Sequence, residues 1–183
     1  MARADLVVDY LVIGIGGVVW AAPALLALFG RDWLYSLVDP GATWVVLALL
    51  AVYLAGICVS QLAAAITRPV FVRIRKEVFG TGSGRSYFRE VTFIAGKSQA
   101  GSEYLRERRS MANILRGCAV DFGAGSVAWL AAGYLRAGGV PLPTAVTVAV
   151  ICAVLCALMV LAYVGSLRAY FRGVKEMYGA LKG

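Results

Sequence analysis

Residues 144–167 read TAVTVAVICAVLCALMVLAYVGSL, and none of these side chains is charged. A helix needs about 20 mostly apolar residues to cross the hydrocarbon layer of a bilayer. The stretch meets this requirement, and it is bounded by Pro143 on one side and Arg168 on the other. It predicts a transmembrane helix, and therefore an integral membrane protein.

The rest of the chain has the same character. Of its 183 residues, 61% are hydrophobic and 15% are charged, whereas ordinary soluble domains have about 25% charged residues. Three further stretches are long and apolar enough to span, so the predicted spans are residues 6–29, 43–66, 112–135 and 144–167. The predicted fold class is an all-α integral membrane protein, a single domain built as a four-transmembrane-helix bundle with amphipathic cytoplasmic helices.

The positive charge predicts the orientation of the chain. Cations gather in residues 67–111 and 168–183, whereas the segments 30–42 and 136–143 carry only Arg31 and Arg136. Basic segments stay on the cytoplasmic side of a membrane. Both termini are therefore expected in the cytoplasm, in a multi-pass protein of the plasma (inner) membrane.

The cytoplasmic segments have helical patterns of their own. Pro69 is expected to end the second spanning helix, and Pro69–Phe79 is expected to form a separate helix at headgroup level. The glycines of Gly80–Gly84 should break that helix. From Ser102 a polar helix is predicted to run directly into the third span. The amphipathic tail, 168–183, should rest on the inner leaflet or on the cytoplasmic helices.

A polar stripe enters the inner end of the third span. Arg106, Arg109, Asn113 and Arg116 recur at steps of three and four residues, which places them on one face of a helix. One interpretation is that Arg116 extends to the interface and the other residues meet lipid phosphates. The other is an anion-attracting vestibule or a ligand site that faces the bundle interior.

Asp121 is a carboxylic acid in the middle of the third span. It lies about 22 Å from the outer interface by helical rise, inside a hydrocarbon layer roughly 30 Å thick. An ionised group at that depth is costly unless it is paired or solvated, so we expect it to face protein. Its role is either functional or structural, with Gln61, Ser60 or Tyr53 of the second span as hydrogen-bond donors.

Asp9 is the second acidic residue that we single out within the predicted spans. Its position in the first span places it near the cytoplasmic interface, where an acid needs little explanation. It is expected to be able to pair with Arg109 or Arg116 of the polar stripe.

Several chemistries have no support in the sequence. The chain contains no histidine, which removes the commonest metal ligand and the commonest general base. Its four cysteines lie in apolar segments, and the glycine-rich stretch Gly80–Arg85 lacks the strand context of a nucleotide loop. We therefore predict no metal, no cofactor and no enzymatic activity.

The first functional hypothesis is an ion or small-solute pore with a basic cytoplasmic vestibule. Four helices enclose little space, so such a pathway is expected at the symmetry axis of a homo-oligomer. The residues that we expect to line the pore or to bind a ligand are Asp121, Arg116, Asn113, Arg109, Gln61 and Asp9.

The second hypothesis is a non-catalytic accessory or assembly subunit with a basic cytoplasmic face. The bilayer, anionic lipids and a soluble protein are its expected partners, and nucleic acid is the least favoured. A lipid-modifying enzyme that uses Asp121 or Asp9 is a third alternative. The residues expected to contact anionic lipid or a partner are Arg73, Arg75, Lys76, Arg106, Arg108, Arg168, Arg172 and Lys175.

Overall fold

The computed structural model describes residues 7–18, 20–21, 42–80, 83–135 and 141–182, and all regular structure within these residues is helical. The helices are an N-terminal helix (Val7–Val18), α2 (Ala42–Phe79), α3 (Ser83–Lys97), α4 (Gln99–Tyr134) and α5 (Leu142–Lys182).

Three of these helices, α2, α4 and α5, are long and apolar enough to cross a membrane, which supports the predicted class of membrane protein. The predicted first span, 6–29, is described only in part, by the apolar Val7–Val18 and two further residues. The four-span arrangement and the cytoplasmic location of both termini therefore stay predictions.

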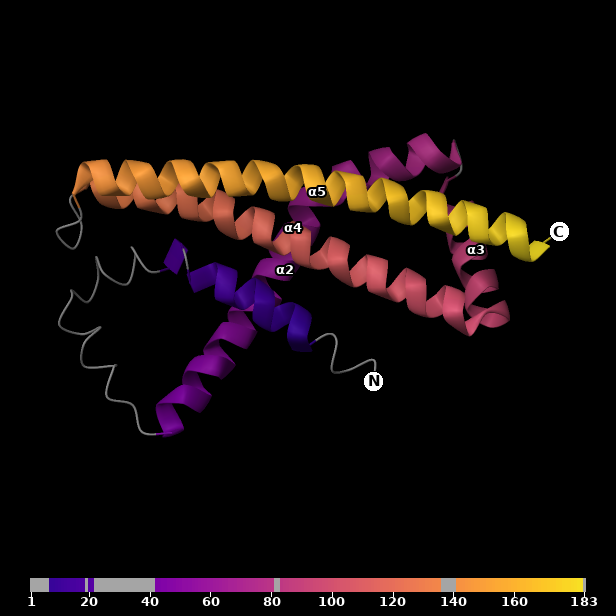
Figure 1. Ribbon diagram of the computed structural model, residues 1–183, viewed down its shortest axis with the longest axis horizontal. Coiled ribbons are helices and arrows are strands. Elements are labelled where there is room, and N and C mark those ends of the chain that lie inside the picture. Colours follow the sequence, from indigo (N-terminus) through magenta and orange to yellow (C-terminus); the bar gives the residue numbers. More distant parts are fainter. Residues whose placement is uncertain (1–6, 19, 22–41, 81–82, 136–140, 183) are drawn as a thin grey trace.

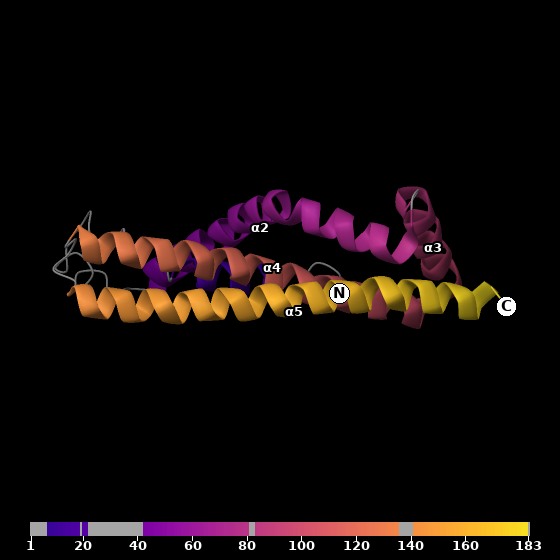
Figure 2. The same ribbon diagram turned by 90° about the horizontal axis from the view of Figure 1, so that it is seen from above.

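The long helices α4 and α5 form an antiparallel pair that extends over the whole length of the molecule (Figures 1 and 2). Small residues allow the last turns of α4 and the first turns of α5 to approach closely. A Cβ atom added to Gly133 of α4 would overlap the methyl group of Ala145 on α5. Close packing of small residues is the usual way in which helices associate in lipid, where burial of apolar surface gives little driving force.

The N-terminal helix crosses α2 at two glycines (Figure 1). A Cβ on Gly14 would overlap the backbone carbonyl of Val52, and a Cβ on Gly56 would overlap the carbonyl of Tyr10. Any side chain at these positions would push the two backbones apart, so this crossing requires glycine from both helices.

The prediction that a helix ends at Pro69 is wrong. Helix α2 continues through Pro69 to Phe79 without interruption, and Figure 2 shows it as an arch rather than a straight rod. Proline removes one helical hydrogen bond and bends a helix, but packing on either side can keep the helix continuous. Here the turns after Pro69 are held by apolar contacts, since Ile74 is buried and Phe71 packs against the same core.

Two predictions about the following segment are confirmed and one element was missed. Helix α2 ends at the glycine-rich stretch, where Gly80 has a left-handed backbone (φ 75°), although α3 begins as early as Ser83. The polar helix does run into the third span, as α4, and it begins at Gln99 with the Ser98 hydroxyl accepting from the Gly101 amide. Helix α3 was not predicted.

We call the part of the molecule formed by residues 67–111 and 168–182 the basic end, and the remaining described residues the apolar end. Large side chains of α2, α3, α4 and α5 form a buried cluster at the basic end and at its border with the apolar end: Ile74, Tyr87, Ile94, Leu105, Ala112, Tyr163, Leu167, Tyr170, Phe171 and Val174. The tail of α5 thus packs on the other helices of the basic end, which was one of its two predicted locations.

Candidate functional site

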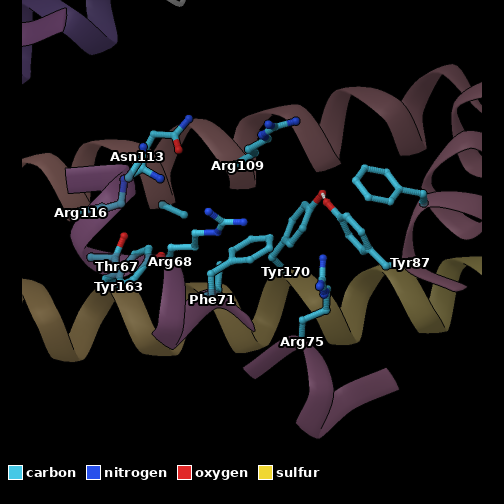
Figure 3. Close-up of a pocket in the computed structure, with 14 residues that line it drawn as sticks. Thr67, Arg68, Phe71, Arg75, Tyr87, Arg109, Asn113, Arg116, Tyr163 and Tyr170 are labelled. Carbon is cyan, nitrogen blue, oxygen red and sulfur yellow. Dashed lines mark hydrogen bonds between the residues drawn. The ribbon is translucent and has the colours of Figure 1, made fainter. Parts of the chain in front are cut away.

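A pocket of about 290 Å³ lies beside this cluster, where α2, α3, α4 and α5 meet. Its polar lining consists of four arginines together with Asn113, Thr67 and three tyrosines, and we call it the arginine pocket (Figure 3). Two arginines come from α2 and two from α4: Arg68, Arg75, Arg109 and Arg116.

Local helical geometry explains why these side chains converge. On α4 the residues Arg109, Asn113 and Arg116 follow one face at steps of four and three. On α2 the residues Arg68 and Arg75 are separated by two helical turns and flank Phe71, which also lines the pocket. The pocket therefore arises where the stripe of α4 faces the part of α2 next to Pro69.

The electrostatics of the pocket are one-sided. Among the described residues that line it there are four guanidinium groups and no carboxylate. The buried Nε atoms of Arg75 and Arg116 find no hydrogen-bond partner among the described residues. Buried polar groups are normally satisfied, so these two nitrogens indicate a site that an anion or ordered water completes.

Aromatic side chains form the wall of the pocket toward α3 and the tail of α5. The hydroxyls of Tyr87 and Tyr170 are joined by a buried hydrogen bond of 2.9 Å. Phe71 meets Phe171 edge to face, with ring centroids 5.2 Å apart, and the Arg75 guanidinium lies 5.8 Å from the Phe71 ring centre. Figure 3 shows Tyr87 and Tyr170 meeting at their hydroxyls. These contacts place the Arg75 guanidinium beside the aromatic wall of the pocket.

The structure divides the predicted polar stripe. It places Arg109, Asn113 and Arg116 in the arginine pocket, whereas Arg106 lines a separate recess that also includes Asp9, Glu103 and Glu107. Gln61, which was predicted to line a pore or bind a ligand, is exposed on α2 and lies in neither lining.

The expected partners of Asp9 were wrong. Its carboxylate accepts from the hydroxyl of Ser110 on α4, at 2.6 and 2.7 Å, and not from Arg109 or Arg116. Since Asp9 is buried, this contact ties the N-terminal helix to α4. The sequence did not reveal it because Ser110 falls between two arginines that seemed the better partners.

The expected hydrogen-bond donors of Asp121 were also wrong. The donor is Trp20, whose indole Nε1 lies 3.2 Å from Oδ1, and not Gln61, Ser60 or Tyr53. The carboxyl is 0% exposed, as expected of an acid that faces protein. Its Oδ2 lies 2.9 Å from the position of a Cβ built on Gly16, so this glycine makes room for the carboxyl. Asp121 is not part of the arginine pocket.

The predicted lipid-contacting cations have different environments. Arg73 and Lys76 are exposed on α2, and Arg172 and Lys175 are exposed on α5. The other four contact protein groups: Arg75 lines the pocket, Arg106 lines the recess beside Asp9, Arg108 lies 5.3 Å over the ring of Tyr104, and the exposed Arg168 is 3.7 Å from Glu77.

Sequence reasoning missed the α5 side of the pocket and most of its α2 side, where only Arg75 was singled out, as an expected contact for anionic lipid or a partner. Arg68 was counted only as a cation of the basic segment, and Tyr163 and Tyr170 were not singled out at all. A signal existed, because tyrosines at a predicted membrane boundary often place a hydroxyl in a polar site. What was lacking was the knowledge that α2 continues past Pro69.

Glu90 is the acidic residue of α3. It is buried, at 8% exposure, and its Oε2 has no hydrogen-bond partner among the described residues. Burial raises the pKa of this carboxyl above its usual value of 4.5, and the positive charges of Arg89 and Lys175 oppose the rise in part. Glu90 therefore favours its neutral form more than an exposed glutamate does.

No protein-family model, no curated protein and no solved structure matches this chain. Among the residues that the structure describes, no three histidine, cysteine, aspartate or glutamate side chains lie close enough to hold a metal ion. The function must therefore be argued from the geometry of the arginine pocket.

Proposed function

We propose that this chain is a non-catalytic membrane protein that binds a phosphate-type anion in the arginine pocket. One observation carries the proposal: four arginines converge on one partly enclosed pocket, and no described carboxylate lines it. The planar guanidinium group of arginine matches the geometry of phosphate oxygens and can bind them by two parallel hydrogen bonds.

The arrangement would be unfavourable if no anion ever bound. Four positive charges that line one small pocket repel one another, and the half-buried Arg75 and Arg116 lose hydration energy that no carboxylate of the described lining returns. An anion would relieve the repulsion and give the buried Nε atoms of Arg75 and Arg116 the acceptors that they lack. The apolar part of the lining, which includes Phe71 and Leu167, would strengthen these contacts by excluding water.

The geometry gives less support to a pore. Asp121 is enclosed by its own chain, bonded to Trp20 and packed on Gly16, which argues against a place on a water-filled pathway. An enzymatic role lacks support as well, because the lining offers no carboxylate, cysteine or histidine as a general base or nucleophile. Association into a homo-oligomer stays a prediction.

Calorimetric titration of the purified chain in neutral detergent with inorganic pyrophosphate tests the proposal. Saturable binding is expected, and Arg116→Gln should weaken it about tenfold to a hundredfold, because one charge-assisted hydrogen bond contributes about 1.5–3 kcal/mol. Arg89→Gln is the matched control, since it removes the same charge from an exposed position of α3 outside the pocket. Equal affinity in all three proteins, or no saturable binding at all, would refute the proposal.

A further inference from the structure

The position of the arginine pocket along the helices suggests where its ligand comes from. Arg68 is the second residue after the predicted second span, 43–66, Arg116 lies one turn inside the third, and Leu167 ends the fourth. The pocket thus lies at the boundary between apolar and basic segments. Lipid phosphates occupy this level of a bilayer, and basic pockets between helices at this depth bind anionic headgroups.

A second recess lies next to the pocket. It is an open depression along α2, lined by Ala65, Arg68, Pro69, Val72, Arg73 and Lys76, and it shares Arg68 with the arginine pocket. One turn toward the apolar end, Leu62 and Ile66 are 55% and 56% exposed. A lipid could therefore place its phosphate near Arg68 and its acyl chains against these apolar side chains.

Size limits what the pocket can enclose. Its volume of about 290 Å³ is at the lower end of the range of small-ligand pockets, roughly 300–1,000 Å³. A headgroup fits such a space, but a lipid with two acyl chains does not. The chains of a lipid ligand would have to leave through the open side, which is where the recess along α2 lies.

Charge limits which headgroup suits the pocket. A phosphodiester carries one negative charge and would leave most of the charge of four guanidinium groups uncompensated. A phosphomonoester or a diphosphate carries more negative charge and offers more acceptor oxygens. The lining thus favours a lipid whose phosphate is terminal.

We infer that the ligand of the arginine pocket is a lipid phosphomonoester or lipid diphosphate whose headgroup enters beside Arg68 and whose acyl chains lie outside, along α2. This inference rests on the proposed function, because it names the source of the anion. The juxtaposition that carries it is the shared lining of the pocket and the lateral recess by Arg68.

Binding of the full chain to lipid vesicles tests the inference. The probes are vesicles of phosphatidylcholine alone, with a minor fraction of phosphatidic acid, or with the same fraction of phosphatidylglycerol, added to detergent-purified protein at detergent concentrations that permit exchange. Native mass spectrometry then counts the lipids retained. Phosphatidic acid should be retained about tenfold better than phosphatidylglycerol, and it should displace pyrophosphate.

Two variants locate the bound lipid. Arg116→Gln should reduce retention of phosphatidic acid about tenfold to a hundredfold, and Arg68→Gln should reduce it by a similar factor. Arg68 is exposed, so its variant is expected to fold even if the half-buried Arg116 does not tolerate substitution. Arg89→Gln, which removes an exposed positive charge of α3 outside the pocket and the recess, should retain the lipid as the wild type does.

The outcomes separate the inference from the proposed function. If pyrophosphate binds in an Arg116-dependent way and phosphatidic acid does not displace it, the lipid inference is overturned and phosphate binding stands. Equal retention of phosphatidylglycerol and phosphatidic acid would overturn the choice of a terminal phosphate. If neither pyrophosphate nor lipid binds, both conclusions fall together.

Discussion

The two ends of this molecule are held together by different means. At the apolar end, helices meet through small residues: Gly14 at Val52, Gly56 at Tyr10 and Gly133 at Ala145. Large side chains there, such as Val150, Val154 and Leu158 of α5, face outward. At the basic end, by contrast, large side chains such as Phe171, Tyr170 and Ile94 are buried together between the helices.

The difference follows from the solvent on each side. In water, burial of a large apolar side chain is strongly favourable, so helices that leave the membrane gather a core of aromatic and branched residues. In lipid the same burial gains almost nothing, and close contact between backbones becomes the source of stability. The cluster of large buried residues at the basic end is therefore what we expect of a part that lies outside the bilayer, and this expectation does not depend on its charges.

The largest effect is expected from Phe171→Ala. This ring is 0% exposed and contacts the rings of Phe71, Phe79 and Tyr87, so its removal leaves a cavity and should cost about 3–5 kcal/mol of unfolding free energy. The matched control is Leu161→Ala on the same helix, where the side chain is 69% exposed at the apolar end. Chemical denaturation in detergent measures both. Similar losses of unfolding free energy in the two variants would contradict the proposed difference between the basic end and the apolar end.

The apolar end should respond to the opposite change, an increase in size. Gly14→Val would insert a branched side chain where even a Cβ overlaps the Val52 carbonyl, and we expect a loss of about 1–3 kcal/mol. Gly165→Val on α5 is the control, because no heavy atom lies within 4 Å of its added Cβ. If Gly14→Val left the free energy of unfolding unchanged, the crossing of the N-terminal helix and α2 would contribute no stability.

A smaller effect is expected at the buried acid. Trp20→Phe removes the indole donor of Asp121, and hydrogen bonds between membrane helices contribute about 0.5–1.5 kcal/mol. In an Asp121→Leu background the same change should cost nearly nothing, because the acceptor is absent. A double-mutant cycle by thermal unfolding measures the coupling. Additive effects of the two changes would show that the contact is not energetically important.

The smallest effect concerns Glu90 and depends on pH. Because burial raises its folded pKa, the protonated form stabilises the fold, and this contribution is lost as the pH rises from 4.5 through the folded pKa. Glu90→Gln should therefore be slightly more stable than the wild type at neutral pH. Melting temperatures recorded across this range should converge below pH 4.5. A constant difference at all pH values would exclude the titration of Glu90 as its cause.

Much of the helical content was predictable, because it depends on local composition. The apolar run at 144–167 predicted the spanning part of α5, and the polar stripe predicted three residues of the pocket. The path of α2 through Pro69 was not predictable from the usual effect of proline on a helix, because packing of Phe71 and Ile74 decides it.

The partners of the buried acids were beyond sequence reasoning for a related reason. Trp20 and Asp121 are 101 residues apart, as are Asp9 and Ser110, and no local pattern joins them. Gly16 of the N-terminal helix allows the carboxyl of Asp121 to approach. The space that a missing side chain leaves becomes visible only when its neighbour is known. The missed helix α3 is different, since Tyr87, Val91 and Ile94 recur at steps of four and three residues, so the sequence itself indicates a helix there.

The hydrogen bond between Tyr87 and Tyr170 has a consequence for folding while the protein is synthesised on the ribosome. Its two residues are 83 positions apart, and at about 5–20 residues per second of synthesis the second follows the first after about 4–17 s. During that interval the apolar face of α3 lacks the α5 side chains that cover it. We therefore expect the newborn basic segment to depend on a chaperone or on the membrane surface until α5 is synthesised.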